Sequence, residues 1–226
     1  MMSPNRPEPQ KLQPPLLYLI TSGATTAQTT SATKDFTNVL ELVRAAVTAA
    51  IDLVQIREQS LRASVLYQLA TSAAAITSGS ATKLLVNDRS DIAFAAGADG
   101  VHLTTQSLGA DVVRRTCGDG FLIGVSTHSL AEADMARRNG ADFVVFGPVF
   151  ATPSKDEYGE PAGLSNLAQV ALELSPFPVL ALGGLNIDSV ADCIQAGAAG
   201  VAAISMFSDS ERLGEIVKEI RERLSH

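Results

Sequence analysis

Eight short apolar runs alternate along this chain with longer, alanine-rich amphipathic segments. Such alternation is typical of repeated strand–helix units around a parallel sheet. Eight units in a chain of 226 residues predict an α/β fold, a single (β/α)8 TIM barrel with a parallel eight-stranded core. An open doubly wound sheet is the main alternative, but no G-x-G-x-x-G motif follows any run. The expected strands span 16–21, 53–58, 83–88, 100–104, 121–126, 143–149, 178–184 and 200–206.

Charge, the length of the apolar runs and cysteine content limit the classes of function. The net charge is −7 and the pI is about 4.9, which disfavours nucleic acid as a partner. No apolar run approaches the roughly 20 residues that span a bilayer, so we expect a soluble, cytoplasmic protein that binds no membrane. The two cysteines, Cys117 and Cys193, lie far apart and fit reduced side chains in that compartment.

The first fifteen residues hold half of the ten prolines and lack the apolar run of a signal peptide. We expect residues 1–14 to form a flexible, proline-rich tail and residues 15–226 to form the catalytic barrel. In such barrels the active site lies at the carboxyl ends of the strands, so polar residues there are the candidates.

Polar side chains alternate at the end of the second run. Gln55, Arg57 and Gln59 point the same way because side chains alternate across a strand. Arg57 offers a planar fork for phosphate or carboxylate, and Gln55 can hydrogen-bond a polar ring. The alternative for Arg57 is a structural ion pair with Asp88 or Glu58; we favour the pocket.

Phosphate in such barrels is commonly held after the seventh and eighth strands. Gly183 and Gly184 end the seventh run, and Ile204 and Ser205 end the eighth, so backbone N–H groups could converge on an anion there. A tight Gly-Gly turn is the plainer interpretation.

The sixth run continues into a long connection rich in glycine and proline. Thr152, Ser154 and Lys155 lie in it and resemble an anion clamp under a movable lid. A solvated surface loop is the alternative.

Two histidines fall on strands or at their ends. His128 lies between a strand end and a helix whose start is marked by the capping box of Ser129 and Glu132, and it suits a general acid or base. His102 lies inside the fourth run, where we expect a hydrogen-bonded core histidine.

The third run ends in Asn87 and Asp88. Either residue could cap the next helix. Alternatively both face the pocket, with Asp88 as an oxygen ligand for magnesium. The residues alone leave both interpretations open.

Seven motifs occur in order: "YLIT", "VQIRE", "LLVNDRSDIA", "GADGVHL", "IGVSTHS", "FGPVFATPSK" and "LALGGLN". Together, from about Leu16 to Ser205, they resemble the thiamine phosphate synthase and thiazole tautomerase family. The resemblance implies a (β/α)8 barrel that acts on a thiazole phosphate in thiamine (vitamin B1) biosynthesis. The synthase joins hydroxymethylpyrimidine diphosphate to this thiazole phosphate, with magnesium-assisted release of diphosphate.

The resemblance also implies roles for individual positions. The synthase positions around the diphosphate and pyrimidine correspond to Gln55, Arg57, Asn87 and Lys155. The positions around the product and its thiazole phosphate correspond to Ser126, Thr152, Ser154, Gly184, Ile204 and Ser205. Asp88 corresponds to a magnesium ligand, so Mg²⁺ is implied as a cofactor only for the synthase.

Two places depart from the synthase pattern. Gln59 stands where a lysine would contact diphosphate. Thr104 and Thr105 stand at a Gly-Gln pair, and Ser107 stands at the second magnesium ligand, which Asp111 could replace. Losing a cation and an anionic metal ligand weakens a site that must separate diphosphate from carbon.

We therefore expect a thiazole tautomerase, an isomerase that aromatises a carboxylated dihydrothiazole phosphate without a cofactor. By resemblance His128 removes the ring C2 proton, and Arg57 or the loop of Ser154 and Lys155 neutralises the substrate carboxylate. The first alternative is the thiamine phosphate synthase, a transferase. The second is a non-catalytic barrel that binds thiazole or thiamine phosphate. The expected partner is the small-molecule thiazole phosphate, and a homo-oligomer stays open.

Overall fold

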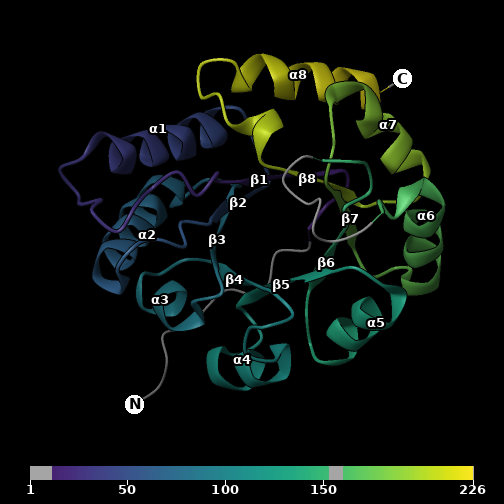
Figure 1. Cartoon of the computed structure of the whole chain (residues 1–226), viewed down its shortest axis with the longest axis horizontal. Helices are drawn as coiled ribbons and strands as arrows, with labels where there is room; N and C mark the ends of the chain where they lie inside the picture. Colours follow the sequence, from purple (N-terminus) through teal and green to yellow (C-terminus); the bar gives the residue numbers. More distant parts are fainter. Residues whose placement is uncertain (1–11, 153–159, 226) are drawn as a thin grey trace.

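The computed structural model describes residues 12–152 and 160–225. Over these residues the chain forms a closed barrel of eight parallel strands in sequence order, with helices around the outside (Figure 1). Pairing of the first strand with the eighth, in the register Leu16↔Gly200 to Leu19↔Ala203, closes the sheet. The predicted (β/α)8 barrel is therefore confirmed.

The strands are short, with four to six residues each. They are β1 (Leu16–Ile20), β2 (Leu53–Ile56), β3 (Lys83–Asn87), β4 (Gly100–Leu103), β5 (Leu122–Thr127), β6 (Phe143–Phe146), β7 (Val179–Leu182) and β8 (Gly200–Ala203). The helices are α1 (Lys34–Thr48), α2 (Ala63–Thr77), α3 (Ser90–Ala95), α4 (Ala110–Cys117), α5 (Leu130–Arg138), α6 (Gly163–Leu174), α7 (Ile187–Gln195) and α8 (Leu213–Leu224), with the 3₁₀ helix η2 (Ser205–Phe207) after β8. In the part of the chain that the structure describes, no helix combines the length and the apolar character needed to cross a membrane. The expected cytoplasmic location stays a prediction.

Most strands end earlier than the sequence pattern predicts. β7 stops at Leu182 because Gly183 and Gly184 follow with φ angles of 100° and 65°, which no strand residue adopts. β6 stops at Phe146, two residues before Pro148, which has no N–H for the ladder. These early ends leave loop backbone at the rim where the site lies.

Buried side chains form two layers, one inside the barrel and one between the barrel and the helices. The interior layer consists of Leu16, Tyr18, Ile20, Leu53, Leu85, Phe143, Val145, Leu180 and Ala202. The intervening strand residues, such as Leu17, Leu19 and Val54, pack against the apolar faces of the helices. The alternation is the period-two pattern that a barrel with covering helices requires.

Gly124 in β5 leaves room for two rings inside the barrel. A Cβ atom at this position would lie 2.4 Å from Phe143 Cζ and 2.8 Å from His102 Nδ1. Phe143 packs edge-on against Tyr18, with ring centroids 5.8 Å apart and an interplanar angle of 81°. We call Tyr18, His102 and Phe143 the aromatic floor; it forms because residue 124 has no side chain.

The Gly124→Ala variant is expected to lower the free energy of unfolding by about 1–3 kcal/mol, because the methyl group must displace Phe143 or His102. Urea unfolding followed by circular dichroism measures this change. Gly214→Ala in α8 is the matched control: a Cβ there meets nothing within 4 Å, so stability should stay constant or rise slightly. Equal losses in both variants would contradict the packing role of Gly124.

Candidate active site

Two adjoining chambers lie at the carboxyl ends of the strands. The central chamber, about 320 Å³, is lined by Ile20, Gln55, Arg57, Gln59, Asn87, His102, Thr104, Thr105, Gln106, Ser126, His128, Leu182 and Ile204. The glycine-side chamber, about 470 Å³, is lined by Ser22, Arg57, Thr152, Leu182, Gly183, Gly184, Leu185, Ala202, Ala203, Ile204 and Ser205. Arg57, Leu182 and Ile204 line both chambers, so the two spaces adjoin at these residues.

The structure thus brings most of the predicted site residues together. Those in the central chamber are Gln55, Arg57, Asn87, Ser126 and His128. Those in the glycine-side chamber are Thr152, Gly184, Ile204 and Ser205. Ser154 and Lys155 lie outside the described residues.

Arg57 follows directly after β2 and is half-buried between the two chambers. Its backbone N–H donates to Thr21 Oγ1 at 2.8 Å, and one guanidinium nitrogen lies 3.5 Å from Gln59 Oε1. Among the described residues it forms no ion pair, so the structural pair with Asp88 or Glu58 that the sequence left open is wrong. A half-buried guanidinium that faces two cavities and pairs with no carboxylate of residues 12–152 and 160–225 is suited to bind an anion.

Glu58 serves the loop after β1 instead. Its side chain is only 2% exposed and accepts hydrogen bonds from the N–H of Gly23 at 3.2 Å and from the N–H and hydroxyl of Thr25 at 3.1 and 2.7 Å. The neighbours Arg57 and Glu58 therefore point in different directions. Sequence reasoning missed this role, although alternation along the strand already separates the two side chains.

A chain of buried hydrogen bonds runs through the aromatic floor. Gln55 Nε2 donates to Tyr18 Oη at 2.7 Å, Tyr18 Oη lies 3.2 Å from His102 Nδ1, and His102 Nε2 lies 2.9 Å from Ser126 Oγ. His102 is 2% exposed and hydrogen-bonded, as predicted, but it also lines the central chamber, which the sequence did not indicate. Burial, with a smaller effect of the Arg57 charge, lowers the pKa of His102 from its usual 6.5 to about 3.

His128 follows β5, and both its backbone N–H and its ring are hydrogen-bonded. The predicted N-cap is present, since Ser129 Oγ accepts from the N–H of Glu132 at 3.2 Å, and Glu132 Oε2 accepts from the N–H of His128 at 2.7 Å. The ring Nδ1 bonds the carbonyl of Gly147, which can only accept. The neutral ring therefore carries its proton on Nδ1 and its lone pair on Nε2.

The glycine pair after β7 packs closely against the loop after β6. A Cβ at Gly184 would lie 2.5 Å from the carbonyl oxygen of Ala151 and 2.7 Å from Phe150 Cβ. This close approach, together with the positive φ angles, requires glycine and brings Thr152 to the same chamber as Ser205. The Gly-Gly pair is thus more than a tight turn.

Asn87 and Asp88 end β3 without capping the next helix. The N-cap of α3 is Arg89, and no side chain caps it, so of the two interpretations that the sequence left open the structure does not support the cap. Asp88 has a φ of 61°, is exposed and is not among the residues lining either chamber. Asp111 pairs with Arg115 on α4, and this pairing lowers the pKa of its carboxyl group.

Residues 12–152 and 160–225 contain no group of three or more His, Cys, Asp or Glu side chains placed to hold a metal ion. Magnesium is often bound by one or two carboxylates together with substrate phosphates. The end of β3, with the single carboxylate of Asp88, therefore fits a magnesium ion only together with a phosphorylated substrate.

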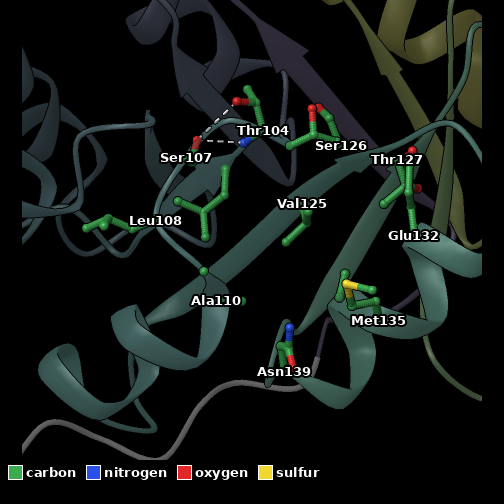
Figure 2. Close-up of a pocket in the computed structure, with 14 residues that line it drawn as sticks. Thr104, Ser107, Leu108, Ala110, Val125, Ser126, Thr127, Glu132, Met135 and Asn139 are labelled. Atoms are coloured by element: carbon green, nitrogen blue, oxygen red, sulfur yellow. Dashed lines mark hydrogen bonds between the residues drawn. The ribbon is translucent and has the colours of Figure 1, made fainter.

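A third cavity lies outside the barrel, between the β4–β5 wall and helices α4 and α5 (Figure 2). This outer cavity, about 310 Å³, is lined mainly by apolar side chains, including Leu103, Leu108, Val125 and Met135. Ser107, on the loop that borders it, bonds the N–H and hydroxyl of Thr104 at 2.8 and 3.1 Å (Figure 2). Ser107 is thus occupied within its own loop.

The fold and these chambers define a (β/α)8-barrel enzyme with its site at the carboxyl ends of the strands. The family model described as thiamine monophosphate synthase matches residues 17–207. The chain therefore belongs to the thiamine monophosphate synthase family.

Individual relatives agree with this assignment. The chain is 40% identical over 185 residues to the thiamine-phosphate synthase of Methanoculleus marisnigri, covering 82% of this chain and 87% of the relative. It is 36% identical over 209 residues to the thiamine-phosphate synthase of Methanoregula boonei, covering 92% and 93%. A solved structure of thiamine phosphate pyrophosphorylase from Pyrococcus furiosus superimposes with a TM-score of 0.73 at 28% identity, covering 91% of this chain and 96% of that one.

The low pKa of His102 predicts a loss of stability in mild acid. Below pH 6.5 the unfolded chain protonates this histidine and the folded chain does not until about pH 3, so the free energy of unfolding falls as the pH falls through this window. The slope from this group is about 1.4 kcal/mol per pH unit. Urea unfolding of wild type and His102→Gln at pH 6 and pH 5 measures it, with a shallower slope expected in the variant. Equal slopes would show that His102 is protonated in the folded protein.

Proposed function

We propose that this protein is a thiamine-phosphate synthase, which joins hydroxymethylpyrimidine diphosphate to a thiazole phosphate and releases diphosphate. The observation that carries the proposal is the pair of adjoining chambers with Arg57 between them. A transferase must hold two substrates with their reacting atoms in contact, and two spaces that share residues meet this need. The names of the relatives support the same activity. The tautomerase that we expected first is not confirmed.

We assign the central chamber to the pyrimidine and its diphosphate. Gln55, Asn87 and Ser126 line it and can hydrogen-bond a polar ring. Arg57 is the only lysine or arginine among the described residues that line the two chambers, so it is the candidate for the diphosphate. Lys155 is proposed as a second cation from the family pattern alone.

We assign the glycine-side chamber to the thiazole phosphate. Gly184 and Ser205 line it and can offer backbone N–H groups, and Thr152 and Ser205 can offer hydroxyls. Ile204 lines both chambers and can contact the thiazole ring and the pyrimidine. Ser154 is included as a phosphate contact from the family pattern.

In the proposed reaction the carbon–oxygen bond to diphosphate breaks, and the thiazole nitrogen forms the new carbon–nitrogen bond. Diphosphate leaves with the electron pair of the broken bond, so negative charge grows beside Arg57. Asp88, which follows the chamber residue Asn87, would hold a magnesium ion, and the chemistry that this ion would supply is further positive charge for the leaving diphosphate. Because Gln59 brings no charge, Arg57 carries a larger share of this work.

A thiazole tautomerase is the second candidate, favoured by the geometry of His128. Its Nδ1 donates to the Gly147 carbonyl, so the lone pair on Nε2 suits proton removal in the central chamber. This reaction would use the same thiazole phosphate and no metal. Neither candidate fixes the oligomeric state, which stays a prediction.

The first test is a product assay. The purified chain with hydroxymethylpyrimidine diphosphate, thiazole phosphate and Mg²⁺ is expected to form thiamine phosphate and diphosphate in equal amounts, because two adjoining chambers can hold both substrates in contact. In parallel, the carboxylated dihydrothiazole phosphate is supplied alone, and chromatography follows its aromatisation. Aromatisation that is lost in His128→Asn, without any thiamine phosphate in the first assay, would replace the synthase by the tautomerase.

Removing the guanidinium tests the site itself. Arg57→Met is expected to lower kcat/KM for thiamine phosphate formation about 100-fold or more, because it removes the charge nearest the leaving diphosphate. Arg44→Met on the exposed surface of α1 is the control and should stay within twofold of wild type. Steady-state kinetics with circular dichroism of both variants measures this. Similar rates for Arg57→Met and the control would remove the basis of the proposal.

A further inference from the structure

We propose that Tyr18 and His102 are positioning residues that direct the hydroxyl proton of Ser126 into the central chamber. They lie behind Ser126, inside the barrel, in the hydrogen-bonded chain that begins at Gln55. The proposal rests on the proposed function and deepens it, because it specifies the kind of pyrimidine ring nitrogen to which Ser126 donates a hydrogen bond.

The direction of the chain follows from counting protons. The Gln55 amide donates to Tyr18 Oη through Nε2, and a phenol has a single proton of its own. The neighbour of Tyr18 Oη on the other side is His102 Nδ1, at 3.2 Å, so the phenol donates to that nitrogen. Nδ1 then acts as an acceptor, and the neutral ring carries its proton on Nε2.

The hydrogen bond between His102 and Ser126 determines which way the hydroxyl proton of Ser126 can point. His102 Nε2–H donates to Ser126 Oγ across 2.9 Å, which uses an oxygen lone pair and leaves the hydroxyl proton available. Ser126 lines the central chamber, so this proton can point into it. The central chamber therefore has a hydrogen-bond donor at Ser126.

The environment keeps His102 neutral. Tyr18 and His102 are both at most 2% exposed, and their rings pack with centroids 5.7 Å apart, while Phe143 lies 6.2 Å from His102. Burial opposes the charged form of the imidazole, and Arg57 on the chamber side opposes it further. Burial likewise raises the pKa of Tyr18, so the phenol keeps its proton.

Gln55 completes the pattern of donors and acceptors. One N–H of its Nε2 donates to Tyr18, which holds the amide group in place, and its carbonyl oxygen can accept from a ligand in the chamber that it lines. An acceptor at Gln55 and a donor at Ser126 complement an aminopyrimidine, whose amino group donates and whose ring nitrogen accepts. A ring with a protonated nitrogen at the same place would leave two donors facing each other.

The first experiment needs no substrate. The full chain is labelled with ¹⁵N-histidine, and long-range ¹H–¹⁵N spectra report which ring nitrogen carries the proton; three histidines are present, and His128→Asn helps to assign them. The expected result is one Nε2–H tautomer for His102 that does not titrate between pH 5.5 and 8. In Tyr18→Phe we expect shifts averaged between two tautomers. An Nδ1–H tautomer or an imidazolium in the wild type would overturn the proposal.

The second experiment links the tautomer to recognition. We expect kcat/KM for hydroxymethylpyrimidine diphosphate to fall about 10-fold in Tyr18→Phe and in Ser126→Ala, and the double variant to be little worse than either. Thr127→Val is the control, because Thr127 is buried and its hydroxyl is without a hydrogen-bond partner in the described structure. It should keep wild-type kinetics.

A substrate analogue separates positioning from general damage. In this analogue a C–H group replaces the ring nitrogen beside the amino group. Wild type should prefer the natural ring about 10-fold, and this preference should disappear in Tyr18→Phe. If Tyr18→Phe kept the full preference of the wild type for the natural ring, the proposed positioning role of Tyr18 would be wrong. If the wild type forms no thiamine phosphate, the synthase proposal fails on its own, and the tautomer of His102 still decides the inference.

Discussion

Closure of the parallel sheet by the ladder between β1 and β8 is the interaction on which the site depends. Because the strands run parallel around one closed ring, all of their carboxyl ends meet at the same rim (Figure 1). Gln55, Ser126 and Ile204 come from strands or strand ends far apart in the sequence, yet they line one chamber. The space inside the ring must also be filled, and Phe143 fills it only because Gly124 yields room.

The electrostatics of the site follow from the same geometry. The chambers meet at Arg57, whose charge is not neutralised by an ion pair with any described residue, while Glu58 is turned away to bind the loop after β1. The end of β2 thus turns a cation toward the chambers and an anion toward the loop after β1. The charge of Arg57 also helps to keep His102 neutral, so the hydrogen-bonded floor depends in part on Arg57.

The sequence predicts the barrel because strand–helix alternation and the eight-unit count are local patterns. It also predicts which strand ends carry the site. It does not predict the chain of Tyr18, His102 and Ser126, because these contacts join residues up to 84 positions apart across the barrel interior. The sequence left a cap at Asn87 or Asp88 open, and the structure does not form it, because Asp88 takes a left-handed turn that places Arg89 at the start of the helix. The tautomerase preference rested on Gln59 and Ser107 and is not confirmed, because the relatives of this chain are named as thiamine-phosphate synthases.

Two neighbouring residues at the end of β5, Ser126 and Thr127, differ in their surroundings. Ser126 and Thr127 both line the outer cavity, but only Ser126 also lines the central chamber, and the hydroxyl of Thr127 is buried without a partner in the described structure. Shifting β5 by one residue would exchange the two sides, because side chains alternate along a strand. A single-codon insertion or deletion within β5 would therefore turn Ser126 away from the central chamber and away from His102 in one step, whereas a point substitution changes one side chain at a time.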